Sequence, residues 1–311
     1  MSDQHPGSYM AKPGVIAITL VALILGGCSS MNMPAITDQP TQVTLQGKVV
    51  WHDLITDVPE ASKHFYQELF GWEFEQVDIG QGLFNAVDYT LIRHNGRLIG
   101  GMVDQAHLKT QEDVSQWINL ISVADVDTAT AAVTAAGGTV LTAPVNLAKR
   151  GRSAVVADQQ GALLALLQTS SGDPLDKAEP DVGGFLWNKL WTEDVTSAAD
   201  FYKQLAGYSD EDNILQDNVE NNREYRLLSS QGKPRVGIMK IPVEDLTPLW
   251  VNYLRIEDAT ALDAIVARVE ELGGSILLDP QDREIGGRVA LIAGPSGAGI
   301  ALQTWPFEAQ Q

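Results

Sequence analysis

The segment FYQELFGW (residues 65–72) returns 136 positions later as FYKQLAGY (residues 201–208), with the aromatic pair, the leucine and the glycine in the same order. Further residues repeat at the same offset: Trp51 with Trp187, Tyr89 with Tyr225, Gly137-Gly138 with Gly273-Gly274, and Arg152 with Arg288. Self-similarity over so much of a chain is the signature of a repeated structural unit. The sequence therefore predicts two domains of one fold, at residues 47–169 and 184–307. Residues 170–183, rich in Gly, Pro and Asp, form the linker between them.

Each domain divides again into two units of one strand, one helix and three strands. Pro59 suits a first helical turn, the apolar positions Ala61, Phe65 and Leu69 share one helix face, and Gly71 ends the helix. The predicted elements of the first unit are strand 48–55, helix 59–70, and strands 72–77, 89–94 and 97–103, the last two joined by an Asn-Gly turn. Those of the second unit are strand 117–123, helix 127–136 with Asp127 as its cap, and strands 139–142, 153–157 and 163–168. The chain thus holds four βαβββ units, an α+β arrangement.

The amino-terminal residues read as a targeting segment rather than as part of the fold. Their apolar run, Val15 to Leu25, is too short to span a bilayer, which needs ~20 residues. The run ends in Leu25-Gly26-Gly27-Cys28, which resembles a bacterial lipobox, and Met10 is an alternative start. We expect residues 1–27 to be a signal peptide, Cys28 to carry a lipid, and residues 28–46 to be a flexible tether. The alternative is an ordinary cleaved signal with an incidental cysteine. The two serines after Cys28, with no aspartate, favour the outer membrane, with the protein facing the periplasm.

Composition excludes several classes of site and partner. Cys28 is the single cysteine, so a lipidated chain offers no cysteine nucleophile and no thiolate metal site. The formal net charge of −19 argues against nucleic acid and against anionic lipid headgroups as partners. Motifs typical of a phosphate loop, a serine nucleophile or nucleic-acid binding do not stand out.

The paired βαβββ units, the FYxxLFGW-type helix end and the late DxxG turn before the final strand resemble the vicinal oxygen chelate superfamily. This group includes glyoxalase I, bleomycin- and fosfomycin-resistance proteins and extradiol dioxygenases. The resemblance covers nearly all of the chain after residue 46 and implies two cupped sheets with helices on their convex sides. In the enzymes of the family, a divalent metal in the cup is held by His, Gln or Glu from the first and last strands of each unit and acts as a Lewis acid.

This sequence departs from that metal-binding pattern. The four last strands read RLIGGMV (97–103), ALLALLQ (162–168), PRVGIMK (234–240) and GIALQTW (299–305), without Asp, Glu or His. The position of the family's glutamate falls on Ala165, or on a neighbouring leucine, and on Ala301 in the second domain. The second domain contains no histidine. Strand alternation counted back from the helix points Trp51 and Asp53 into the cup and His52 toward the helix layer, although a shift of one residue would reverse this. His52 is the one plausible remaining metal ligand, and we expect no cofactor.

Other residues are candidates for a ligand pocket. Asp53 beside Trp51 has the character of a proton-abstracting carboxylate or of a rim charge, and Lys189 takes its place in the second copy. The tryptophans that open the first strands suit either packing or the lining for a flat ligand. The matched arginines suit either an anion clamp or ion pairs with acidic neighbours. The candidate pocket residues are Trp51, Asp53, Trp117, Arg152, Trp187, Lys189, Trp250 and Arg288.

Three functions remain open at this point. The first is a lipid-anchored protein that binds a small apolar or aromatic molecule without a metal. The second is a metal-dependent enzyme of the glyoxalase or dioxygenase type that uses the first domain, which requires His52 in the cup. The third is a structural or interaction role at the cell envelope, with both cups filled by side chains.

Overall fold

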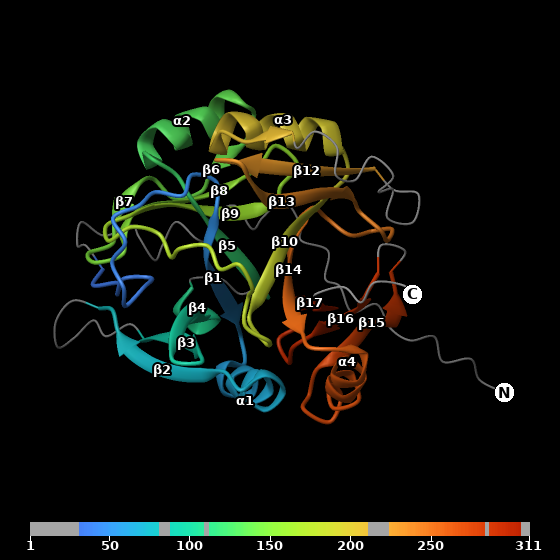
Figure 1. Ribbon diagram of the computed structural model, residues 1–311. Coiled ribbons are helices and arrows are strands. Elements are labelled where there is room, and N and C mark those ends of the chain that lie inside the picture. The colour runs from blue at the N-terminus through green and yellow to red at the C-terminus, as the bar shows by residue number, and fades with distance from the viewer. Residues whose placement is uncertain (1–30, 81–87, 109–111, 211–223, 284–285, 306–311) are drawn as a thin grey trace.

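The computed structural model describes residues 31–80, 88–108, 112–210, 224–283 and 286–305 (Figure 1). The elements of the first half are β1 (Val49–Thr56), α1 (Pro59–Phe70), β2 (Glu73–Asp78), β3 (Asp88–His94), β4 (Arg97–Asp104), the 3₁₀ turn η3 (Gln105–His107), β5 (Gln116–Ser122), α2 (Val126–Ala135), β6 (Thr139–Val140), β7 (Val145–Asn146), β8 (Gly151–Ala157) and β9 (Leu163–Thr169). Those of the second half are β10 (Phe185–Thr192), α3 (Val195–Ala206), β11 (Ser209–Asp210), β12 (Tyr225–Ser230), β13 (Lys233–Lys240), β14 (Leu249–Ile256), α4 (Ala259–Val266), β15 (Ser275–Asp282), β16 (Arg288–Ala293) and β17 (Gly299–Thr304).

The strands form two mixed sheets with the same plan, which confirms the predicted α+β fold. The first sheet has the order β2-β3-β4-β1-β5-β9-β8-β6, with β7 beside β8, and the second has the order β11-β12-β13-β10-β14-β17-β16-β15. In each sheet the first strands of the two units, β1 with β5 and β10 with β14, are antiparallel neighbours at the centre. Each of them has a parallel neighbour on its other side, the last strand of its own unit.

The two sheets pack together through the faces that carry their helices. At one end α2 and α3 lie side by side, and at the other end α1 lies beside α4 (Figure 1). One apolar core joins α2, α3 and both sheets, and a second core joins α1, α4 and both sheets. Burial of these faces is the main source of stability for such an arrangement, because removal of apolar surface from water is the dominant favourable term in folding. The cupped faces of the two sheets consequently point away from each other.

The repeated segment is the end of the first helix in each half. Phe65 and Tyr66 are buried against the sheet, and Gly71 ends α1 in the left-handed conformation with φ of 67°. Gly207 ends α3 in the same way with φ of 66°. Such a helix end favours glycine, which has no Cβ to clash. The segment therefore fixes the fold and holds no reactive group.

Two local predictions were wrong. The buried face of α1 runs through Ser62, Phe65, Tyr66 and Phe70, while Ala61 is exposed and Leu69 is half-buried. Asp125, not Asp127, caps α2, because its carboxylate accepts a hydrogen bond from the Thr128 amide at 2.7 Å. Asp127 lies inside the first helical turn, where its carboxylate instead meets Arg152.

Residues 31–46, predicted to belong to a flexible tether, are packed against the fold. Met33 and Ile36 are buried in the apolar cluster on the cupped face of the first sheet. Farther on, the Leu45 amide donates to Asp173 at 2.6 Å, and the Gln46 carbonyl accepts from the Ser230 hydroxyl of the second half. Apolar side chains at intervals in this Ser-, Thr- and Pro-rich stretch explain why it packs.

None of the described helices is long and apolar enough to cross a membrane.

Candidate ligand-binding cups

The face of each sheet that lies opposite the helices is its cup. The first cup is the face of β1, β3, β5 and β9, and the second cup is the face of β10, β12, β14 and β17. Their apolar linings correspond position by position: Trp51, Tyr89, Ile118, Leu120 and Ala165 in the first cup, and Trp187, Tyr225, Val251, Tyr253 and Ala301 in the second. Each cup carries charge at one shared place, Asp53 in the first and Lys189 in the second.

The first cup contains a connected polar cluster. The Asp53 carboxylate accepts hydrogen bonds from the Trp51 indole at 2.8 Å and from the Tyr89 hydroxyl at 2.5 Å. Arg150 Nη1 donates to the Tyr89 hydroxyl at 3.1 Å, and it lies 4.0 Å from the second Asp53 oxygen. The guanidinium of Arg150 also lies over the Trp51 and Tyr89 rings, at 4.8 and 5.0 Å from their centroids. Arg150 is only 1% exposed, so charge, hydrogen bonds and rings hold a cation inside an apolar face.

Glycines make room for the tyrosine of each cup. A Cβ at Gly101 would lie 1.7 Å from the Tyr89 hydroxyl, and one at Gly237 would lie 2.5 Å from the Tyr225 hydroxyl. Gly101 pairs with Asp53 across the parallel strands, and Gly237 pairs with Lys189. The tyrosine ring therefore lies over the glycine next to the charged side chain in both cups.

The second cup places a cation among aromatic rings. Lys189 is 4% exposed, and its ammonium lies 5.5 Å from the Tyr225 ring centroid and 4.9 Å from that of Tyr253. Trp187 and Tyr225 are half-buried here, whereas their counterparts Trp51 and Tyr89 are 1% and 2% exposed. The second cup thus presents aromatic surface that the first cup keeps covered.

Four of the candidate pocket residues lie elsewhere. Trp117 and Trp250 face the helix layer, where Trp117 contacts Tyr66 and Trp250 contacts Tyr202. Arg152 and Arg288 form ion pairs at the surface. Arg152 pairs with Asp127, and Arg288 pairs with Asp263 and Asp282. The structure does not bring these four side chains into either cup. Trp51, Asp53, Trp187 and Lys189 remain.

His52 lies between the two sheets. Its ring stacks on Phe185 with centroids 3.6 Å apart, and Nε2 is 2.9 Å from the Asn188 amide oxygen. Asn119 pairs with His52 across β1 and β5, and Asn252 pairs with Asn188 across β10 and β14. The centre of the interface is therefore a small polar cluster enclosed by apolar cores, and His52 belongs to it rather than to the first cup.

The residues of the cups do not fit a family-type metal site. The places from which the family would supply ligands hold Trp51 or His52 on β1, Ala165 on β9 and Ala301 on β17. His52 points away from the cup, and the carboxylate of Asp53 accepts hydrogen bonds from an indole and a phenol. Among the described residues, no group of three or more His, Cys, Asp or Glu side chains is arranged to hold a metal ion. Oxygen or imidazole donors from several strands are what such a site requires.

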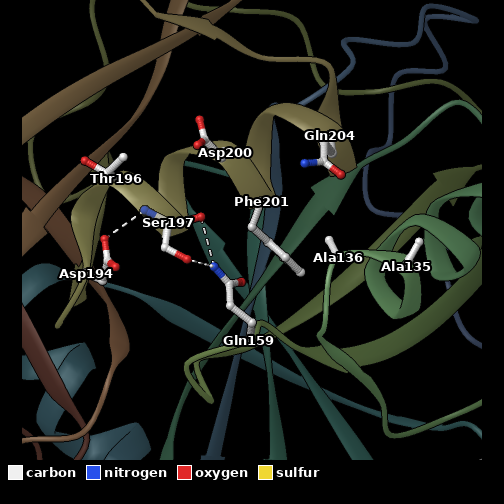
Figure 2. A pocket seen from close by; sticks show the side chains of 9 residues that line it. All are labelled: Ala135, Ala136, Gln159, Asp194, Thr196, Ser197, Asp200, Phe201 and Gln204. Carbon is white, nitrogen blue, oxygen red and sulfur yellow. Dashed lines mark hydrogen bonds between the residues drawn. The ribbon is translucent and has the colours of Figure 1, made fainter.

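A separate shallow pocket lies where α2 meets α3 (Figure 2). Gln159 Nε2 donates to the carbonyl and hydroxyl oxygens of Ser197, at 2.9 and 3.1 Å, so the amide joins the two halves across the floor of this pocket. Asp194 and Asp200 stand at its rim and Phe201 supplies an apolar wall. These contacts are those of a packed helix junction, and none of the cup residues reaches it.

Sequence reasoning missed Arg150, the most buried charge in the first cup. The matched pair of Arg152 and Arg288 drew attention to the neighbouring position, whereas the place of Arg150 in the second copy is taken by Gly286. Tyr253 was missed for the related reason that its counterpart is Leu120. Arg150 and Tyr253 are positions at which the two copies differ, so a search for repeated residues does not find them.

Comparison with known proteins agrees with this fold. Residues 48–166 match the family model of the Glyoxalase/Bleomycin resistance protein/Dioxygenase superfamily. "Putative glyoxylase CFP32" of Mycobacterium tuberculosis is 28% identical over 255 residues, which are 81% of this chain and 93% of that protein. "Anthracycline biosynthesis protein DnrV" of Streptomyces peucetius is 28% identical over 270 residues, 82% of this chain and 92% of that protein.

Solved structures share the fold at low sequence identity. The Mn(II)-bound glyoxalase from Novosphingobium aromaticivorans superimposes with a TM-score of 0.56 at 15% identity, covering 84% of this chain and 83% of that one. The 2,2',3-trihydroxybiphenyl 1,2-dioxygenase of Sphingomonas wittichii gives a TM-score of 0.54 at 18% identity, covering 84% and 90%. These likenesses concern the arrangement of the chain and not its chemistry.

The enclosed position of His52 predicts a pH-dependent stability. Burial lowers the pKa of His52 from 6.5 to about 4. The unfolded chain therefore binds a proton more readily than the folded chain between these values. The contribution of His52 to the free energy of unfolding should be full above pH 6.5 and should fall by up to roughly 3 kcal/mol as the pH drops to about 4.

Urea unfolding of the wild type and of His52→Gln at several pH values measures this effect. The stability advantage of the wild type over H52Q should shrink from pH 7 to pH 4. The matched control is His64→Gln, which changes an exposed histidine on α1 and should leave the pH dependence unaltered. Parallel curves for the wild type and H52Q would contradict the prediction.

Proposed function

We propose that this chain, whose residues 48–166 match the family model of the Glyoxalase/Bleomycin resistance protein/Dioxygenase superfamily and whose second half repeats that fold, binds a small aromatic or apolar molecule in a cup without a metal ion. The observation that carries the proposal is the pattern of side chains on the cup strands. Where metal donors would stand, the cups carry tryptophan, tyrosine and alanine around Asp53 and Arg150 in the first cup and around Lys189 in the second.

The second cup suits an anionic aromatic ligand. Lys189 is a buried cation with aromatic rings on two sides, and Trp187 and Tyr225 retain exposed surface beside it. A carboxylate or phenolate on Lys189 with its ring against Trp187 would combine a charge-assisted contact with burial of a flat apolar surface. Two relatives are named anthracycline biosynthesis proteins, so an anthracycline is a rational compound to include in a first screen.

The alternative function is a metal-dependent enzyme of the glyoxalase or dioxygenase type that uses the first cup. The names of the relatives and of the structural neighbours favour it. The donor set argues against it, since His52 serves the interface, Asp53 accepts hydrogen bonds from Trp51 and Tyr89, and the described residues hold no metal-binding cluster of acids and histidines. A metal titration decides between the two functions.

Purified protein should hold less than stoichiometric Zn²⁺, Mn²⁺, Fe²⁺ or Ni²⁺ by elemental analysis. Calorimetric titration with each ion should show no saturable tight binding. The His52→Ala variant serves as the comparison and should behave like the wild type. One tightly bound metal per chain that is lost in H52A would overturn the metal-free proposal.

Replacing Lys189 by Met keeps the length of the side chain and removes its charge. Binding of 2-naphthoate, followed by quenching of tryptophan fluorescence, should weaken roughly 10- to 150-fold, because a hydrogen bond to a charged group contributes roughly 1.5–3 kcal/mol. Lys63→Met removes a charge on α1, far from the cup, and should bind the probe as the wild type does. Equal affinity of K189M and the wild type would exclude Lys189 as the anion partner.

We further propose that the mature protein is attached to the membrane through a lipid on Cys28 and faces the periplasm. The lipobox-like sequence before Cys28 supports this proposal; Cys28 itself lies outside the described residues. A lipid on Cys28 would be separated from the first described residue, Met31, by two residues, so the fold would lie next to the membrane.

Cys28→Ala should move the protein from the membrane fraction to the soluble fraction and abolish labelling with a palmitate analogue. Cys28→Ser tests the same chemistry with a smaller change in side-chain size. The membrane-bound share of the wild type should resist extraction with salt, as expected for an acylated and not an electrostatic attachment. Unchanged membrane association of C28A would refute the lipid anchor.

A further inference from the structure

Residues 31–40, the leading segment, lie against the first cup. Met33 is 7% and Ile36 is 1% exposed, and both belong to the apolar cluster that contains Trp51 and Tyr89. The Asn32 amide donates to the Ile79 carbonyl at 3.0 Å, and Asp38 meets Arg93 of β3 at 2.6 Å. The segment is therefore held at both of its ends with two apolar side chains between.

The leading segment makes one polar contact with the buried cation of the first cup. Arg150 Nε donates to the Pro34 carbonyl at 3.2 Å. Arg150 Nη1 is taken by Tyr89, while Nη2 is buried with no hydrogen-bond partner among the described residues. A buried donor without an acceptor costs free energy. Arg150 Nη2 can therefore donate a hydrogen bond to one more oxygen atom, beyond the carbonyl oxygen that the segment supplies to Nε.

The leading segment explains why two cups of the same plan differ in exposure. Trp51 and Tyr89 are covered, whereas Trp187 and Tyr225, which hold the same places in the second cup, are half-buried. Arg150 has no counterpart either, since Gly286 stands at its position. Among the described residues, the cover and the cation that binds it thus occur together in the first cup.

We propose that the leading segment is a built-in occupant of the first cup and that its contacts define the ligand that replaces it. That ligand is an apolar or aromatic molecule with a carboxylate. One oxygen takes the place of the Pro34 carbonyl on Arg150 Nε, the second oxygen satisfies Nη2, and the apolar body takes the place of Met33 and Ile36. This inference rests on the proposed function, in that it assigns the ligand class and the regulation of one of the two cups.

The occupant lowers the apparent affinity of the first cup in proportion to the time it spends in place. A ligand that binds a site open for only a fraction of the time has its dissociation constant raised by the inverse of that fraction. A carboxylate probe should therefore bind the wild type in the second cup first. A variant whose leading segment is released should bind a second equivalent.

Ile36→Asp places a charge where the segment is buried and should release it without altering any strand. Calorimetric titration with 2-naphthoate should give one equivalent for the wild type and two for I36D, with affinity at the first cup raised at least about tenfold. Met33→Asp should have the same effect. Val43→Asp is the matched control, because it adds the same charge at a side chain that is 40% exposed and should leave the stoichiometry at one.

Hydrogen exchange of residues 31–40 reports the position of the segment independently of any ligand. The Asn32 amide, which donates to the Ile79 carbonyl, should be protected in the wild type and in V43D and should exchange fast in I36D. Adding Arg150→Met to I36D should weaken the second equivalent of 2-naphthoate about tenfold but leave binding of neutral naphthalene-2-methanol unchanged.

Two results would overturn the inference: two equivalents in the wild type with the segment still protected, or one equivalent in I36D with the segment released. Absence of naphthoate binding to every variant would refute the proposed function as well. In that case, slow exchange of the segment would show only that it packs on the cup. Failure of the inference and failure of the proposed function therefore give different results.

Discussion

The packing of the two sheets through their helix-bearing faces determines where all other features lie. Successive residues of β1 point to opposite faces, so Trp51 and Asp53 belong to the cup while His52 and Leu54 belong to the interface. The stack of His52 on Phe185 and its hydrogen bond with Asn188 hold this register, because a slip of one residue would break both contacts and bury Asp53 between the sheets. The chemistry of the cups thus depends on contacts made on the opposite side of the strand.

The two cups share a frame and differ in electrostatics. In both, a tyrosine lies over a glycine of the neighbouring strand beside the charged position. The Asp53 carboxylate accepts hydrogen bonds from Trp51 and Tyr89, and Arg150 lies beside it. The first cup therefore holds both signs of charge in one cluster. Lys189 is surrounded by rings, which favour a cation and also offer faces for a flat partner.

Much of the fold could be predicted from the sequence, because its signals are local. The repeated helix end, the Asn-Gly hairpin and the apolar strands each depend on neighbours within a few residues. The alanine at position 165 likewise follows from counting along one strand. The contact between Pro34 and Arg150 joins residues 116 positions apart and has no periodic or compositional signal, so neither partner was predicted as part of the site. Trp117 and Trp250 were misplaced because an aromatic residue at a strand start suits either face of a sheet.

The chain enters its two repeated domains in different ways. Residues 31–40, which lead into the first domain, lie across the cup of that domain. The second domain is entered through a linker fixed by Asp176 on Lys48, Lys233 and Arg235, and by the Pro180 carbonyl on Arg255. The linker is thus tied to basic residues of both domains. The asymmetry between the two cups extends to the segments that lead into the domains: two copies of one module in a single polypeptide differ in how the chain arrives at each of them.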